Sequence, residues 1–154
     1  MKIIRNTKAI YFDMDGTIAN LYAVLGWLGM LRAEETTPYA LAEPMVRMNV
    51  LARLLNALKR DGWTIGIVSW TAKNGTKEYN ERVAEVKKEW LATHLKSVEF
   101  DEIIIVPYGT PKENVVENPF GILFDDEEQN RNNWKGKAFD VQNIIEIIKE
   151  VRAI

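Results

Sequence analysis

The sequence contains no cysteine and one histidine, His94, among its 154 residues. The absence of cysteine excludes a disulfide-stabilised scaffold, a Cys-ligated zinc site, a cysteine nucleophile and a thiol redox centre. One histidine excludes a metal site built from several histidines. A Ser-His-Asp triad can only use His94.

Long apolar runs and an excess of positive charge are also missing. The longest uncharged apolar stretch, residues 21–31, is shorter than the ~20 residues that span a bilayer. Charges at Lys2, Arg5 and Lys8 interrupt the N-terminal segment, so it lacks the apolar core of a signal peptide. Lys and Arg number 20 against 22 Asp and Glu, without the basic excess of a general nucleic-acid binder. We therefore expect a cytoplasmic protein that binds neither a membrane nor duplex nucleic acid.

Length and composition are those of an ordinary globular protein. Hydrophobic residues make up 47% and charged residues 27%, both typical of soluble domains. A domain averages roughly 150 residues, and a chain of that size buries a real core. We expect a single domain over residues 1–154.

Short apolar runs alternate with amphipathic helical patterns. The runs predict strands at 9–12, 63–68, 103–106, 121–124 and 138–139. The helical spacing predicts helices at 45–60, 77–95 and 141–151, the last with Asp140 as its N-cap. Because the strands are apolar on both faces, this alternation predicts an α/β fold, a three-layer Rossmann-like sandwich around a parallel sheet.

Residues 18–44 do not follow this alternation. They are rich in aliphatic and aromatic residues and contain two prolines. We expect them to form a small helical cap over one end of the sheet. The segment carries Tyr22, Trp27 and Tyr39, any of which can stack on a nucleobase or close a small core.

Polar residues stand near the ends of the predicted strands. They are Asp13 and Asp15 after the first, Ser69 after the second, Lys112 beyond the third, and Asp125 and Asp126 after the fourth. Ligands of open α/β sheets bind at the carboxyl ends of the strands, so these side chains are expected to converge.

The chemistry of these residues suits a phosphate ester. A carboxylate at a strand end can attack phosphorus. Close carboxylates repel one another and a phosphate dianion, and hard Mg²⁺, which prefers oxygen ligands, relieves that repulsion. Gly16 permits a sharp turn beside the ligand. Lys112 and Ser69 can hold phosphoryl oxygens by charge and by hydrogen bonding.

The segment 13–17 (DMDGT) after a hydrophobic strand resembles the first motif of the haloacid dehalogenase superfamily. Ser69 resembles the second motif, Lys112 the third and the Asp125-Asp126 pair the fourth, all in the right order. The match spans roughly residues 9–150. The resemblance implies an enzyme of the phosphatase type, a phosphoric monoester hydrolase that uses Mg²⁺.

The resemblance also implies a role for each carboxylate. Asp13 is the expected nucleophile, which forms an aspartyl-phosphate. Asp15 is expected to protonate the leaving group and then to activate water. The expected Mg²⁺ ligands are the Asp13 side chain, the Asp15 backbone carbonyl and Asp126. Asp125 is expected to contact one of these ligands, or to reach the ion through a water molecule.

Within the superfamily the chain looks most like the 5′(3′)-deoxyribonucleotidases. The likeness lies in Lys73, in Lys88-Glu89-Trp90 and in residues 103–112. It implies that the substrate is a nucleoside monophosphate that contacts Thr17, Ser69, Trp70, Lys73 and Lys112.

Three other functions fit parts of the pattern. A sugar phosphate or another phosphorylated metabolite can replace the nucleotide. A phospho-signalling receiver domain also combines acidic residues, a hydroxyl, a lysine and Mg²⁺, but it phosphorylates an Asp of a middle strand and has no late Asp pair. A binding module without catalysis would not need the full set of catalytic residues.

Overall fold

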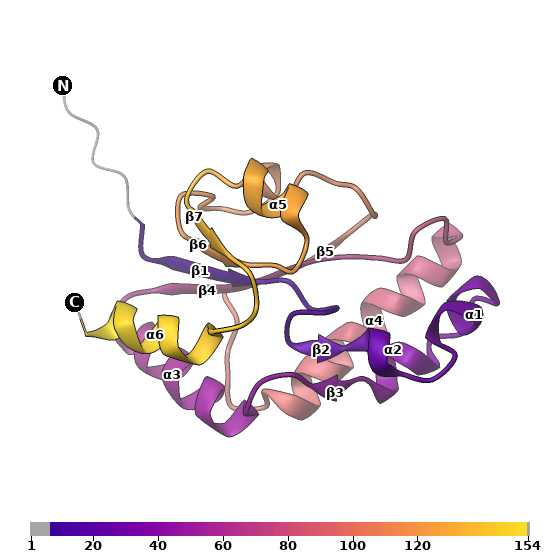
Figure 1. Cartoon of the computed structure of the whole chain (residues 1–154), viewed down its shortest axis with the longest axis horizontal. Helices are drawn as coiled ribbons and strands as arrows, with labels where there is room; N and C mark the ends of the chain where they lie inside the picture. The colour runs from indigo at the N-terminus through magenta and orange to yellow at the C-terminus, as the bar shows by residue number, and fades with distance from the viewer. Residues whose placement is uncertain (1–6, 154) are drawn as a thin grey trace.

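A computed structural model describes residues 7–153, and its centre is a five-stranded, all-parallel sheet (Figure 1). From one edge to the other the strands are β5 (Glu102–Val106), β4 (Thr64–Trp70), β1 (Ala9–Phe12), β6 (Ile122–Phe124) and β7 (Lys137–Phe139). This arrangement confirms the α/β fold with a parallel sheet.

The strand order places a crevice between β1 and β6. Counted in chain order within this sheet, the strands run third, second, first, fourth, fifth. The order reverses beside β1, and such a switch point is where doubly wound sheets bind their ligands. Receiver-type domains have the flavodoxin-like order of second, first, third, fourth, fifth, so this topology is not theirs.

Strand β4 is longer than its sequence suggests. The predicted strand ended at residue 68, but Ser69 pairs with Ile105 and Trp70 with Val106. Ser69 therefore lies inside the sheet, near the carboxyl end of the strand, and its side chain is completely buried.

One face of the sheet is covered by α3 (Met48–Arg60), α6 (Ile144–Arg152) and the C-terminal part of α4 (Lys77–His94) (Figure 1). The other face is covered by residues 107–121, which include the 3₁₀ turn η2 (Lys112–Asn114), and by α5 (Glu128–Asn133) with the adjacent Trp134. Alternate residues of each strand pack into these two layers.

Two predicted helix starts are wrong. The helix expected from residue 45 begins at Met48, because Glu43–Pro44 is held extended as strand β3 and the Met45 amide donates to the Ile18 carbonyl. The helix expected after Asp140 begins at Ile144, with Asn143 at its N-cap position. Asp140 instead accepts a hydrogen bond from the neighbouring Val141 amide.

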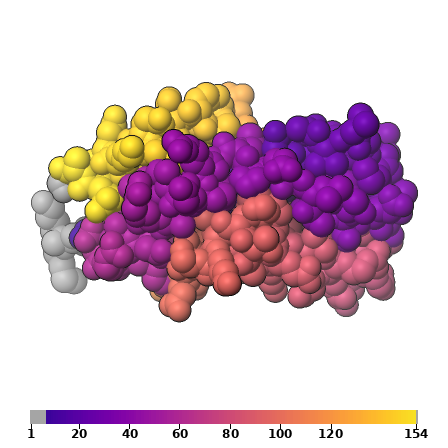
Figure 2. Space-filling view, turned by 90° about the horizontal axis from the view of Figure 1, so that it is seen from below, coloured from indigo at the N-terminus to yellow at the C-terminus, as the bar shows by residue number. Residues whose placement is uncertain are grey.

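Residues 18–44 form a compact insertion that lies along α4 (Figure 2). Two short antiparallel strands, β2 (Ala19–Asn20) and β3 (Glu43–Pro44), join it to the sheet domain. Between them lie η1 (Leu21–Ala23), α1 (Trp27–Arg32) and α2 (Thr37–Leu41). None of the helices in residues 7–153 has the length and apolar character needed to span a membrane.

Candidate active site

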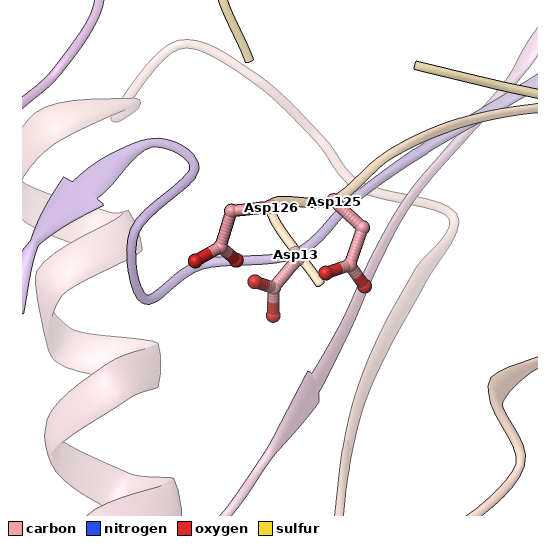
Figure 3. A group of neighbouring side chains, drawn as sticks. All are labelled: Asp13, Asp125 and Asp126. Carbon is pink, nitrogen blue, oxygen red and sulfur yellow. The ribbon is translucent and has the colours of Figure 1, made fainter. Parts of the chain in front are cut away.

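Three carboxylates converge at the crevice between β1 and β6 (Figure 3). Asp13 follows β1, and Asp125 and Asp126 follow β6. The two strands are parallel neighbours, and the Asp13 amide continues their pairing by donating to the Phe124 carbonyl at 2.9 Å. One oxygen atom from each carboxylate lies within 4.8 Å of the others. This oxygen-only cluster matches the ligands that Mg²⁺ prefers.

The electrostatics of the cluster favour a cation. Burial, followed by the charge of Asp13, raises the pKa of both Asp125 and Asp126. The positive charges of the protein therefore do not fully offset the repulsion between these carboxylates. A divalent ion relieves this crowding and favours their ionised forms.

Asp125 and Asp126 differ in how far the protein already engages them. Both oxygens of Asp125 accept hydrogen bonds, from Lys112, from Asn130 and from the Glu127 amide. Asp126 is less buried, and Thr17 lies 3.4 Å from its Oδ1. Asp126 therefore has more coordinating capacity left than Asp125.

Lys112 connects Asp13, after β1, to the Asp pair after β6. Its Nζ donates to Asp13 Oδ1 at 3.0 Å and to Asp125 Oδ2 at 2.6 Å, and the side chain is 2% exposed. Burial lowers its pKa, but the two carboxylates outweigh burial and leave the pKa raised. Two of the three ammonium protons are thus engaged, which leaves one for a phosphoryl oxygen.

Asp15 lies outside the three-carboxylate cluster. Its Oδ2 accepts a hydrogen bond from Lys87 at 2.7 Å. Burial raises the pKa of Asp15, and the Lys87 charge opposes that rise. A raised pKa suits a carboxyl group that must carry a proton before it donates one.

Thr17 and Gly16 shape the turn after β1. The Thr17 hydroxyl lies 3.2 Å from Asp13 Oδ2 and accepts from the Asp126 amide at 3.3 Å, so it joins the two halves of the site. Gly16 has a φ of +77°, in the region that favours glycine. A Cβ there would collide with the carboxylate of Asp126 and lie 2.8 Å from the Tyr22 ring.

A cavity of about 490 Å³ lies between the insertion and the loop after β4. Its lining includes Trp27, Arg32, Tyr39, Thr71, Lys73 and Tyr108. Thr71 is 7% exposed, and its hydroxyl has no hydrogen-bond partner among residues 7–153. A buried hydroxyl without a partner is unfavourable, and a ligand in the cavity can satisfy it.

Trp70 lies between Lys112 and Tyr108, and Tyr108 lines the cavity. Its ring is 5.2 Å from Lys112 Nζ and 4.8 Å from the ring of Tyr108, and its indole N–H donates to the Thr110 carbonyl. Lys73 Nζ lies 5.7 Å from the Tyr108 ring, on the cavity side. Two aromatic rings, those of Trp70 and Tyr108, therefore lie in contact between Lys112 and Lys73 at the cavity.

Comparisons with known proteins define the fold. A scan against protein-family models finds no match, and a search of curated proteins finds none either. Among solved structures, the chain is similar to a D,D-heptose 1,7-bisphosphate phosphatase from Burkholderia thailandensis. The TM-score is 0.59 at 7% identity, over 96% of this chain and 99% of that chain. The chain has the fold of this phosphatase.

This likeness agrees with the haloacid dehalogenase fold that the four motifs imply. This neighbour is not a nucleotidase, so it does not support the narrower resemblance to the 5′(3′)-deoxyribonucleotidases. At 7% identity the shared property is the fold, so the chemistry has to be argued from the residues of this chain.

Lys87 and Thr71 are among the polar residues at the site that the sequence predictions did not include. Lys87, rather than its neighbour Lys88, points from α4 toward Asp15, and Thr71 lines the cavity. Lys87 has a recognisable signal, because it stands one helical turn after Val83 on the buried side of α4. Thr71 offers no comparable signal, since a hydroxyl after a strand is common.

Proposed function

We propose that the chain is a Mg²⁺-dependent phosphatase that hydrolyses a small phosphomonoester through an aspartyl-phosphate on Asp13. The observation that carries the proposal is the placement of Asp13 at the β1–β6 crevice, bonded to Lys112 and grouped with Asp125 and Asp126. A carboxylate able to act as nucleophile, a cationic donor and a carboxylate cluster suited to a divalent ion thus lie together at the end of β1.

The proposed reaction has two steps. In the first, an Asp13 oxygen forms a bond to phosphorus while the bond to the leaving oxygen breaks, and Asp15 gives that oxygen its proton. In the second, Asp15 takes a proton from water, the water oxygen attacks phosphorus and the bond to Asp13 breaks. The products are an alcohol and inorganic phosphate, and both carboxyl groups return to their starting states.

The residues that would hold Mg²⁺ are Asp13, Asp126 and the backbone carbonyl of Asp15. Asp125 would not bind the ion directly, because its oxygens already accept hydrogen bonds from Lys112, Asn130 and the Glu127 amide. It would instead act on the ion through these neighbours or through water. When bound, the ion neutralises the carboxylates and the phosphoryl oxygens. Lys112 uses its remaining proton, and Ser69 its hydroxyl, to bind those oxygens.

We infer that the leaving group occupies the cavity beside the insertion, and that a nucleoside monophosphate fits it best. Trp27, Tyr39 and Tyr108 supply aromatic surface in the lining, and Thr71 supplies an unpartnered hydroxyl. Stacking of a base on an aromatic side chain contributes about 1–3 kcal/mol in nucleic-acid binders. That energy corresponds to roughly 5- to 150-fold in affinity.

A second candidate substrate is a phosphomonoester with another anionic group. Arg32 and Lys73 both line the cavity, and neither forms a salt bridge with another residue in the described range 7–153. Two available cations can bind a second phosphate, such as that of a sugar bisphosphate. Arg32 belongs to the insertion, and Lys73, which the sequence analysis already named as an expected substrate contact, lies in the loop after β4.

The substrate is tested by comparing kcat/KM for deoxynucleoside monophosphates, ribose 5-phosphate and a sugar bisphosphate at the same Mg²⁺ concentration. We expect the nucleotides to exceed ribose 5-phosphate by about 5- to 150-fold, and Tyr108→Ala to reduce that ratio. Leu25→Ala is the matched control, because Leu25 is 95% exposed and does not line the cavity. Equal kcat/KM for the nucleotides and ribose 5-phosphate would show that the site does not recognise the base. Preference for the bisphosphate, lost in Arg32→Ala, would select the second candidate.

Gly16→Ala tests whether the turn after β1 sets the catalytic geometry. The new Cβ would displace Asp126, and a shift of about 1 Å in an active site can cost about 10²-fold in rate. Gly62→Ala is a matched control, because Gly62 also has a positive φ, +90°, but no atom lies within 4 Å of a Cβ there. Measured by denaturant unfolding, Gly62→Ala should lose about 1–2 kcal/mol of stability, and Gly16→Ala at least as much, because its Cβ also collides with neighbouring side chains. Only Gly16→Ala should lose phosphatase activity, and equal activity in the two variants would contradict the assignment.

A further inference from the structure

Lys87 is a buried cation that the proposed reaction does not yet use. It projects from the middle of α4 and is 1% exposed. Lysine is almost never fully buried unless its charge is paired. Its neighbour Lys88 shows the ordinary behaviour, with a half-exposed side chain 3.8 Å from Glu85.

All three ammonium protons of Lys87 have acceptors within the protein. Its Nζ donates to Asp15 Oδ2 at 2.7 Å, to Ser69 Oγ at 2.9 Å and to the Trp70 carbonyl at 2.7 Å. An ammonium group has three donors, so none remains for a substrate oxygen. Lys112 differs, because only two of its protons are engaged. The geometry therefore separates a lysine that can bind phosphate from one that cannot.

The bonds of Lys87 fix two groups that must contact the substrate. Asp15 is held through one carboxylate oxygen, which leaves the other oxygen to carry the proton for the leaving group. Ser69 accepts from Lys87, so its own hydroxyl proton is free to point toward a phosphoryl oxygen. The Trp70 carbonyl anchors the ammonium to the end of β4. Lys87 thus ties the turn after β1 to the end of β4.

The insertion closes the remaining side of this arrangement. The Tyr39 ring lies 5.1 Å from Lys87 Nζ, and Tyr39 is itself buried and lines the cavity. Water is therefore largely excluded from the ammonium group, which strengthens its interaction with Asp15.

We propose that Lys87 is a positioning residue that holds Asp15 in the orientation for proton transfer to the leaving oxygen. This inference rests on the proposed phosphatase function, since it assigns how Asp15 is placed for that reaction. Lys87 itself does not contact the substrate.

The first test compares leaving groups. In Lys87→Met, kcat/KM for an alkyl phosphate such as a deoxynucleoside monophosphate should fall by about 10²- to 10⁴-fold, the usual contribution of general acid catalysis. For 4-nitrophenyl phosphate, kcat/KM should fall by less than about 10-fold, because 4-nitrophenolate leaves without a proton. The ratio kcat/KM is used because it reports the steps through aspartyl-phosphate formation, whereas kcat also includes its hydrolysis. Equal losses for both substrates would overturn the proposal.

The second test is a double-mutant cycle, which also covers the case that Lys87→Met folds poorly. Lys87→Met combined with Asp15→Asn removes both buried charges, so it avoids leaving one unpaired. If Lys87 acts through Asp15, adding Lys87→Met to Asp15→Asn should cost less than about 3-fold in kcat/KM for the alkyl phosphate. A further loss as large as that in the wild-type background would show an independent role and overturn the proposal.

Lys88→Met is the matched control on the same helix, and it should retain wild-type kcat/KM with both substrates. The activity of the wild type and of Asp13→Asn tests the proposed phosphatase function separately from the positioning role of Lys87. If the wild type hydrolyses phosphate esters and Asp13→Asn does not, the proposed function stands, and the two Lys87 tests decide the positioning role by themselves.

Discussion

Asp13→Asn is expected to abolish phosphatase turnover while the protein stays folded. Asparagine keeps the shape of the side chain but lacks the charge needed to attack phosphorus. Loss of a covalent nucleophile in a well-studied protease costs about 10⁶-fold in kcat, and we expect at least about 10⁴-fold here. The measurement is kcat with a deoxynucleoside monophosphate, together with a thermal unfolding curve.

Asp61→Asn is the matched control for Asp13→Asn. Asp61 is exposed and caps the C-terminal end of α3, far along the chain from the carboxylate cluster. It should retain wild-type turnover. If Asp13→Asn kept a tenth of the wild-type rate, a covalent mechanism through Asp13 would be excluded. Trapping of a labelled phosphoryl group on the wild type, but not on Asp13→Asn, would identify the intermediate directly.

Removal of Mg²⁺ is expected to have an effect of similar size. EDTA should stop turnover, and added Mg²⁺ should restore it, because the carboxylate cluster repels a phosphate dianion unless a cation is present. Asp126→Asn should weaken Mg²⁺ binding more than Asp125→Asn, since the oxygens of Asp125 are already engaged within the protein. Calorimetric titration with Mg²⁺ measures both. Unchanged Mg²⁺ affinity in Asp126→Asn would remove Asp126 from the metal ligands.

Asp126→Asn should also raise the Tm of the metal-free protein. Burial and the nearby Asp13 charge raise the pKa of Asp126 above its unfolded value of about 3.9. The folded state therefore binds that proton more tightly than the unfolded chain, and wild-type stability declines as pH rises above about 4. Asparagine does not titrate, so the Tm difference should widen from about pH 5 to about pH 8. Relieving such active-site strain commonly adds about 0.5–2 kcal/mol, or a few degrees at about 2–4 °C per kcal/mol.

The sequence predicted the parallel sheet well, because its strands are buried on both faces and read as continuous apolar runs. The runs at 9–12 and 121–124 correspond closely to β1 and β6, and the polar residues that follow them converge as expected. Both the fold and the acidic cluster depend on this one pattern, since a parallel sheet brings its carboxyl ends to one edge.

Features that depend on tertiary contacts were beyond the sequence patterns. Asp140 has the right residue type for an N-cap, but α6 begins four residues later, at Ile144. Helix α3 starts later than predicted because the residues before it form β3, which pairs with β2. Strand β2 lies nearly thirty residues before the start of α3 in the chain. Lys87 was overlooked because a lysine in a charged helix usually faces solvent, and only the packing of α4 against the end of β4 reveals its partners.

The charge balance around the β1–β6 crevice has a kinetic consequence. Four carboxylates, those of Asp13, Asp15, Asp125 and Asp126, face two ammonium groups, those of Lys87 and Lys112. With Asp15 protonated, as the first step of the proposed reaction requires, three carboxylates face these two ammonium groups, and one negative charge stays uncompensated before a dianionic substrate arrives. Under the proposed function we therefore expect ordered loading, with the cation first and the phosphate ester second, and release of inorganic phosphate that leaves the ion in place. We expect the metal to remain bound through successive turnovers, so that its concentration would set how many molecules can accept substrate.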